Sequence, residues 1–151
     1  MNKYKKYRLN NPEKVKETKR KNYEKYRERN KIKRKEYIDK NWPRSQFGLT
    51  KRNAEVNAKI RNIPFNLTTK DLHEIYDIQG GVCALSGLAF IRGDNTGPSI
   101  FTIGLDRIVP ALGYVKGNVR FILHGLNALK SNGTDEDVFK IIRAVSERLK
   151  L

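Results

Sequence analysis

The uneven distribution of charge along the chain is the feature that most constrains its fold. Residues 1–40 carry 17 basic and 6 acidic side chains, whereas residues 67–151 carry 10 basic and 9 acidic ones. Large apolar residues are too sparse in the first forty positions to form a stripe that faces a core. The sequence therefore predicts a basic arm over residues 1–40, a linker over 41–50 and a globular domain over 51–151.

The net charge of +16 limits the partners of this chain. A long cationic segment binds polyanions, and nucleic acid is the abundant extended polyanion of the cytosol. The alternatives are a solubility tail or an arm that binds anionic lipid. No apolar run approaches the roughly 18 residues of a membrane span, and a single cysteine excludes an internal disulfide. We expect a cytoplasmic protein that binds double-stranded DNA and neither a membrane nor a small-molecule substrate.

The arm lacks glycine and is rich in Lys, Arg and Glu. These residues favour a helix from about 12 to 39, with Pro12 in its first turn and Asn11 as its cap. The arm residues expected to contact DNA phosphates are Lys14, Lys16, Lys19, Arg20, Arg27 and Arg34.

The rest of the chain predicts an α+β domain. We expect short helices over 51–61, with Ala54, Ala58 and Ile60 on one face, and over 70–76. Strands are expected within 82–108, separated by a polar loop over 92–98, and residues 118–127 should pass from a strand into a helix. The strongest pattern predicts a C-terminal helix over 135–150. Thr134 and Asp137 suit a capping box there, and apolar residues recur at helical spacing.

One segment carries residues suited to catalysis. Residues 104–130 contain Asp106 and Arg107, then the run Gly-Tyr-Val-Lys-Gly-Asn-Val, then Asn127 and Lys130. This ordered set resembles the HNH, or His-Me finger, endonucleases, specifically the small phage-type enzymes. In that family a β-hairpin and a following helix hold one divalent metal. The resemblance implies a ββα-metal finger at about 80–131, flanked by helices.

The resemblance also assigns roles to individual residues. Asp106 and Asn127 match the ligands of one Mg²⁺ (or Mn²⁺) per active site, ions that prefer hard oxygen donors. Asn118 matches the residue that ties the hairpin loop together. Arg107 stands where the family usually has the histidine that activates water; a guanidinium is a poor general base but binds phosphate well. His124, one helical turn before Asn127, is the candidate replacement base, with an ordinary packing histidine as the alternative.

Relatives often brace the finger with zinc bound by two Cys-x-x-Cys pairs. Here only Cys83 remains, and the second pair falls on Leu123 and Leu126. One thiolate cannot hold a structural zinc, so we expect no zinc and a small buried cysteine. His73 is expected to be structural. The DNA contacts expected from this domain are Lys116, Arg120 and Lys130.

The sequence therefore predicts an HNH-type, metal-dependent DNA endonuclease, for example a free-standing homing-type enzyme, in the host cytoplasm if a phage encodes it. One alternative is a DNA-binding protein whose nuclease site has decayed. Another is a junction-resolving nuclease, related to endonuclease VII-like metal fingers. The oligomeric state stays open, since cutting both strands at once would favour a homodimer.

Overall fold

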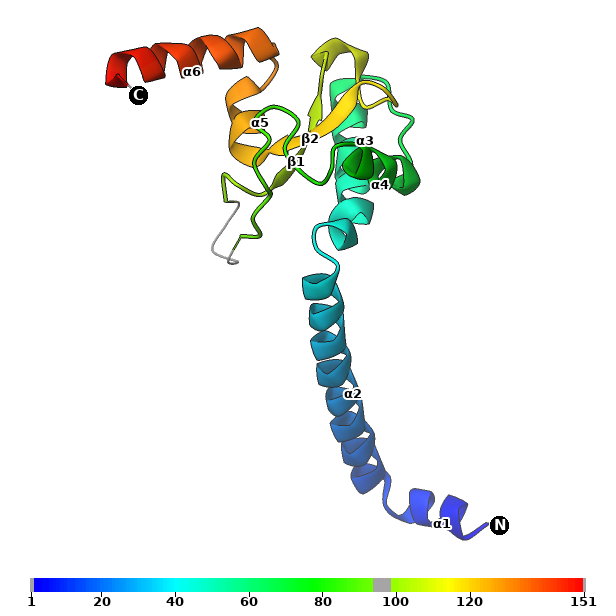
Figure 1. Cartoon of the computed structure of the whole chain (residues 1–151). Coiled ribbons are helices and arrows are strands. Elements are labelled where there is room, and N and C mark those ends of the chain that lie inside the picture. Colours follow the sequence, from blue (N-terminus) through cyan, green and yellow to red (C-terminus); the bar gives the residue numbers. More distant parts are fainter. Residues whose placement is uncertain (1, 94–98, 151) are drawn as a thin grey trace. The chain divides into compact units, whose positions relative to one another are not determined.

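A computed structural model describes residues 2–93 and 99–150 of the chain. It is α+β and mostly helical, with a small two-stranded antiparallel sheet. The chain divides into two compact units, Met1–Asn41 and Trp42–Leu151. Figure 1 gives the order of the elements. In the described part of the chain, no helix combines the length and the hydrophobicity that crossing a membrane requires.

The first unit consists of helices α1 (Lys3–Asn10) and α2 (Pro12–Lys40). Helix α2 confirms the expected helix and begins with Pro12, whose fixed φ suits a first helical position. The cap is different from the prediction, because the Asn11 side chain donates to the Tyr7 carbonyl of α1 instead of accepting from α2. No described residue of α2 is buried, so this helix contributes no core.

The predicted linker over 41–50 is wrong, because most of it is packed helix. A short 3₁₀ helix η1 (Arg44–Gln46) leads into α3 (Phe47–Arg61). Phe47 is completely buried and stacks on Phe121, with the ring centroids 4.9 Å apart. Burying such a ring contributes about 2–3 kcal/mol. The segment therefore belongs to the hydrophobic core of the second unit.

Helix α3 buries Ala54 and Ala58, as the sequence predicts, but Ile60 is 75% exposed. Two residues turn an α-helix through about 200°, so Ile60 points away from the face that holds Ala58. Helix α4 (Thr69–Ile78) begins at a capping box formed by Thr68 and Asp71. It packs Leu72 into the same core.

The sheet pairs β1 (Ile103–Arg107) with β2 (Val119–Leu123) in antiparallel register, so that Asp106 lies opposite Arg120. Between the strands are a 3₁₀ turn η2 (Pro110–Leu112) and the loop held by Asn118. Strand β2 runs directly into α5 (His124–Lys130), which confirms the predicted passage from strand to helix.

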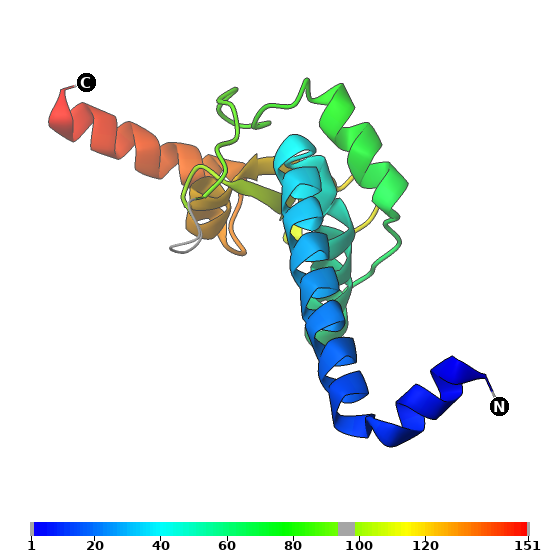
Figure 2. The same ribbon diagram turned by 90° about the horizontal axis from the view of Figure 1, so that it is seen from below.

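Of the strands expected within 82–108, the described residues of this range form β1 and one isolated bridge between Val82 and Ala89. Most of the polar loop predicted over 92–98 lies outside the described residues. In Figures 1 and 2 the sheet of the second unit lies between α3 and α5. This arrangement sets one face of α3 beside the end of β1.

The last helix, α6 (Asp135–Leu149), has the predicted capping box of Thr134 and Asp137. Of its apolar stripe, only Val138 is buried. The others are exposed by 44–61%: Ile141, Ile142, Val145 and Leu149. The stripe correctly predicts the helix, but beyond its first turn this face is not covered by the described residues.

Candidate functional site

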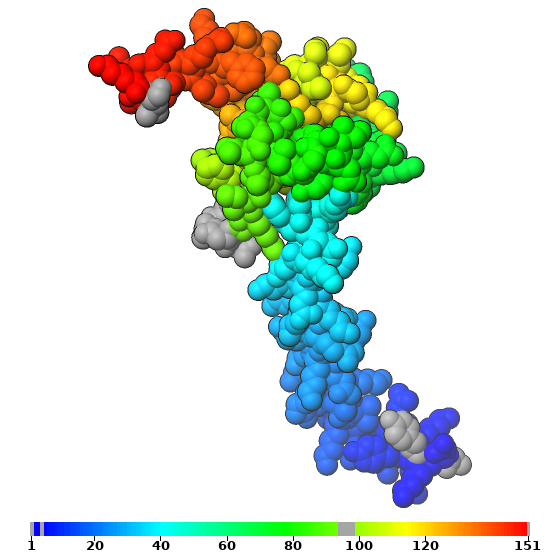
Figure 3. All heavy atoms as spheres, viewed as in Figure 1, coloured from blue at the N-terminus to red at the C-terminus, as the bar shows by residue number. Residues whose placement is uncertain are grey.

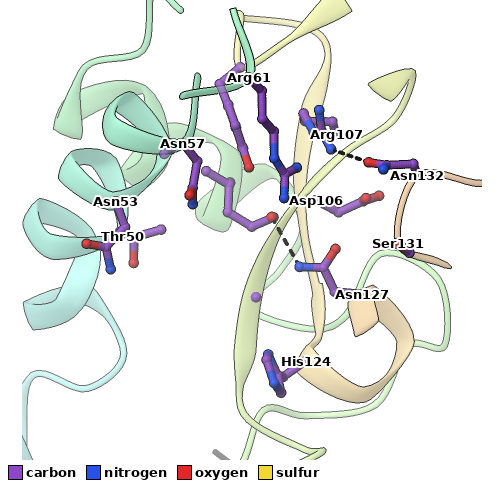
Figure 4. A pocket seen from close by; sticks show the side chains of 14 residues that line it. Thr50, Asn53, Asn57, Arg61, Asp106, Arg107, His124, Asn127, Ser131 and Asn132 are labelled. Atoms are coloured by element: carbon purple, nitrogen blue, oxygen red, sulfur yellow. Dashed lines mark hydrogen bonds between the residues drawn. The ribbon is translucent and has the colours of Figure 1, made fainter. Parts of the chain in front are cut away.

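A pocket of about 420 Å³ opens between α3 and the segment that runs from β1 to the loop after α5. Figure 4 shows the side chains that line it. Four of the five residues expected to be catalytic are among them: Asp106, Arg107, His124 and Asn127. Gly104 permits their close approach, because a Cβ at this position would lie 3.3 Å from Nδ2 of Asn127.

Asp106 is 3% exposed and lies at the centre of a buried charge network. Nζ of Lys130 donates to its Oδ1 at 3.1 Å and to its Oδ2 at 2.9 Å, while Nε of Arg120 donates to Oδ2 at 2.9 Å. Both cations also pair with Asp135. The hydrogen bond from Arg120 lowers the pKa of Asp135 and so keeps this carboxyl ionised. The two carboxylates, Asp106 and Asp135, and the two cations, Arg120 and Lys130, therefore balance each other in charge.

This network corrects the assignment of Arg120 and Lys130 to the DNA-binding surface. The Lys130 side chain is fully buried, and its Nζ also donates to the carbonyls of Arg107 and Ile108. The Arg120 side chain is 14% exposed. A buried carboxylate requires nearby cations to replace its lost hydration. The two residues serve Asp106 and are not available to the phosphates of a nucleic acid.

Arg107 is held from two sides. Its guanidinium donates to the Pro110 carbonyl at 3.0 Å and to Oδ1 of Asn132 at 3.1 Å, and its Cζ lies 5.3 Å from the centroid of the Tyr114 ring. It is 8% exposed but reaches the pocket. Such a fixed guanidinium suits the binding of an anionic oxygen.

Asp106 and Asn127 carry oxygen atoms of the kind that magnesium prefers. Oδ1 of Asp106 accepts one hydrogen bond, which leaves it a free lone pair. Nδ2 of Asn127 donates to the Leu105 carbonyl at 3.4 Å, so the amide oxygen is the free end and, in Figure 4, faces Asp106. Mg²⁺ commonly takes one or two protein oxygens and completes its shell with water and phosphate. Among the described residues, no three His, Cys, Asp or Glu side chains cluster as a metal site.

The two histidines occupy different surroundings. His124 begins α5 and lines the pocket at the end away from Arg107 (Figure 4). His73 lies on α4, where its ring packs against Phe47 with centroids 4.9 Å apart and its Nδ1 contacts the Arg44 guanidinium at 3.3 Å. This packing agrees with the structural role predicted for His73.

Asn118 does not line the pocket. It is 6% exposed, its Nδ2 donates to the carbonyls of Val109 and Gly113, and its Oδ1 accepts from the Val109 amide. These three bonds close the hairpin loop. Asn118 therefore acts as the predicted loop fastener and is misplaced in a set of catalytic residues.

Cys83 is 1% exposed, and the Leu123 amide donates to its sulfur at 3.4 Å. Leu123 is buried, and Leu126 packs against the core. Lys116 bridges Asp71 and Glu74 with its side chain 65% exposed, so it remains accessible to a phosphate.

One wall of the pocket was missed by sequence reasoning. It comes from α3 and consists of Thr50, Asn53, Asn57 and Arg61. The last three are polar and recur at every fourth position, so they share one side of the helix. They parallel the apolar residues Ala54 and Ala58, which are also four residues apart. That periodic polar row was the available signal. Arg61 forms no ion pair with any described residue and points from α3 toward Asp106 in Figure 4.

In the first unit, the charges of α2 are segregated. At about 100° per residue, five of the six acids of α2 gather within one quarter of the helix. The opposite side, here called the acid-free face, holds seven cations and three tyrosines: Lys16, Lys19, Arg27, Arg29, Lys33, Arg34, Lys40, Tyr23, Tyr26 and Tyr37. The tyrosines are 55–63% exposed. This face suits a polyanion.

Four of the six arm residues predicted to bind DNA lie on the acid-free face: Lys16, Lys19, Arg27 and Arg34. Arg20 lies at its edge and pairs with Glu24, and Lys14 lies on the acidic side. Comparisons of the chain with family models, curated proteins and solved structures found no match.

Proposed function

We propose that this chain is a metal-dependent DNA endonuclease that hydrolyses phosphodiester bonds in the pocket between α3 and β1. The observation that carries the proposal is the gathering of Asp106, Arg107, His124 and Asn127 in one pocket. Oxygen donors beside a fixed cation are the groups that phosphodiester cleavage requires. The acid-free face of α2 supports DNA as the substrate class, because cations and exposed aromatic rings together bind nucleic acid.

Arg107 and Arg61 would bind the scissile phosphate. The network around Asp106 is neutral, so these two guanidiniums leave the pocket positive. Each guanidinium can donate two parallel hydrogen bonds to phosphate oxygens. Because Asn132 and the Pro110 carbonyl hold Arg107 in place, its charge is oriented before the reaction begins.

Asp106 and Asn127 would hold one Mg²⁺ or Mn²⁺ ion. Bound there, the ion would supply Lewis-acid stabilisation of the phosphate and the departing 3′ oxygen. Since Lys130 and Arg120 already balance the charge of Asp106, these residues should hold the ion only weakly before DNA arrives.

His124 would accept the proton of the attacking water. A neutral imidazole has an acceptor nitrogen near neutral pH, whereas the guanidinium of Arg107 has none. Loss of His124 should therefore lower the single-turnover rate by about 10².

The second candidate is a DNA-binding protein without cleavage activity. It is favoured by the engagement of both carboxylate oxygens of Asp106 with Lys130 and Arg120. On this alternative the charge network only stabilises the fold, and the pocket holds a phosphate without breaking its bonds.

Cleavage of supercoiled plasmid distinguishes the two candidates. Nicks or breaks should appear with Mg²⁺ or Mn²⁺ and disappear with EDTA. Asn127→Ala is the sharpest variant, because Asn127 is half-buried and makes one long hydrogen bond, so the fold should survive. It should lose cleavage and keep DNA affinity. A wild-type rate in Asn127→Ala would refute the metal site, and tight binding without cleavage by the wild type would favour the second candidate.

A comparison of cleavage of four-way junctions with cleavage of linear duplex tests the junction-resolving alternative.

A further inference from the structure

Helix α6 leaves an apolar face uncovered by the described residues. Val138 in its first turn is 1% exposed, but the next turns expose Ile141 by 45%, Ile142 by 44%, Val145 by 51% and Leu149 by 61%. In Figures 1 and 2 this helix projects from the rest of the second unit, and Figure 3 shows it as a protrusion. Leu129 of α5 borders the same face, and a shallow groove runs between the two helices.

A stripe of this kind differs from scattered exposed apolar residues. The four side chains lie within about 100° of the helix circumference and span about two turns. Contiguous apolar surface on a soluble unit marks a site of association. The question is what covers it.

The charges of α6 answer that question. The first turn is acidic, with Asp135, Glu136 and Asp137, and the C-terminal end carries Arg148 and Lys150. Asp137 and Arg148 are eleven residues apart, close to three turns, so both lie on the same edge of the apolar face. Hydrogen bonds from the backbone and side chain of Thr134 lower the pKa of Asp137, which stays ionised. The helix is therefore complementary to an antiparallel copy of itself.

We infer that this face is the interface of a homodimer in which α6 packs antiparallel against α6 of a second copy. The two-fold axis passes between Ile142 and Arg143, midway between Asp137 and Arg148. Each Asp137 then faces the other copy's Arg148, so the pair forms twice, as two-fold symmetry requires. The antiparallel helix dipoles add to the attraction.

The size and charge of the chain set the behaviour of this dimer. Four or five side chains cover less than the roughly 800 Å² per partner of a standard interface, so the dimer is concentration-dependent. Each chain carries a net charge of +16, and the two chains repel one another. Salt screens that repulsion, so association strengthens with salt, whereas binding to DNA weakens. The inference does not depend on the proposed nuclease activity.

Cysteine cross-linking of the full chain tests the geometry. The native Cys83 is buried, so an introduced thiol reports on its own position. Near the two-fold axis, Ile142→Cys should form an intermolecular disulfide, because facing Cα atoms of packed helices lie within the roughly 4.4–6.8 Å that a disulfide spans. In the antiparallel pair, Leu149→Cys is about 20 Å from its counterpart and should not cross-link. Cross-linking at both positions, or at neither, would overturn the antiparallel pairing.

Sedimentation equilibrium of the full chain without DNA tests the interface itself. Over about 1–200 µM, which covers the Kd range of small interfaces, the wild type should pass from monomer to dimer. The double variant Ile141→Glu/Val145→Glu should remain monomeric with unchanged helicity by circular dichroism. Ile78→Glu is the matched control, since Ile78 is 86% exposed at the end of α4, and it should dimerise like the wild type. A wild type that stays monomeric throughout, or a double variant that dimerises, would overturn the inference.

Discussion

Asp106 is only 3% exposed, so its carboxylate has lost most of its water, and nearby cations replace that water. Lys130 and Arg120 do this from α5 and β2. The same carboxylate is among the residues that line the pocket. At the residue scale, Asp106 belongs both to the buried charge network and to the candidate metal site.

Removing one partner of this network should destabilise the fold. Lys130→Met leaves Asp106 with one cation fewer, which should cost about 3–5 kcal/mol of the free energy of unfolding. Urea denaturation measures this loss. Lys116→Met is the control, because the Lys116 side chain is 65% exposed and its ion pairs are screened by solvent, and it should cost less than about 1 kcal/mol. Equal stability of Lys130→Met and the wild type would show that the network contributes nothing to folding.

Arg61 should matter for cleavage and not for folding. It has no ion pair with any described residue, so Arg61→Ala should change the free energy of unfolding by less than about 0.5 kcal/mol. Loss of its contact with the phosphate should lower the single-turnover cleavage rate by about 10². Arg52→Ala removes an exposed arginine from α3 outside the pocket and serves as the control. If both variants cleave alike, α3 is not a wall of the active site.

At the scale of elements, α2 carries seven cations on its acid-free face and six elsewhere, in different surroundings. Replacing Lys16, Arg27 and Arg34 by Gln removes three charges from the acid-free face. Each phosphate contact makes the log–log slope of affinity against salt more negative by about 0.9. The triple variant should therefore have a slope that is shallower than that of the wild type by about 2.7. Replacing Lys21, Lys31 and Lys35 by Gln removes the same charge from the acidic side.

The acidic-side variant should keep a nearly unchanged slope, since Lys21 and Lys31 are already paired with Glu17 and Glu28. Fluorescence anisotropy with one duplex at several salt concentrations measures both. Equal losses would show that DNA responds to the total charge of the arm and not to one face.

The cap of α4 predicts a pH dependence. Hydrogen bonds from the Thr68 side chain and backbone, with a contribution from Lys116, lower the pKa of Asp71 to about 2. The unfolded value is about 4, so ionised Asp71 stabilises the fold above that pH, and the contribution is lost as the pH falls from about 4 to 2. Asp71→Asn should therefore be less stable than the wild type above about pH 4, and this difference in the free energy of unfolding should shrink as the pH falls from about 4 to 2. Urea midpoints at each pH measure it. A constant difference would contradict the assignment.

At the scale of the whole molecule, the buried hydrophobic core residues that the structure describes lie within the second unit, from Phe47 to Val138. Deleting residues 1–41 should therefore leave the thermal unfolding of residues 42–151 within a few degrees of the full chain. The full chain should bind duplex DNA with a log–log salt slope of about −5 to −9, if the arm contacts six to ten phosphates.

The truncated protein should bind much more weakly and with a flatter slope, yet still cleave slowly at high protein concentration. Circular dichroism and anisotropy measure the two effects. Equal affinity of both proteins at the same salt concentration would show that the arm serves another partner.

The sequence alone was sufficient where structure depends on near neighbours. Helix α2, the capping box of Thr134 and Asp137, and the passage from β2 into α5 follow from propensity, capping and spacing within a few residues. The gathering of Asp106, Arg107 and Asn127 was predicted through the resemblance of residues 104–130 to the HNH pattern, and the hairpin and following helix bring these residues to one pocket.

Tertiary structure decided which charged and apolar groups are buried. From the sequence, Lys130 was expected at the surface, but it is buried because it pairs with the buried Asp106. Phe47 was expected in a linker, but it is buried because it stacks on Phe121. Arg61 reaches the pocket only because α3 packs beside β1. Spacing along one helix predicts the apolar stripe of α6, but not whether the fold covers it. Burial depends on contacts between residues far apart in the chain, and local patterns do not determine those contacts.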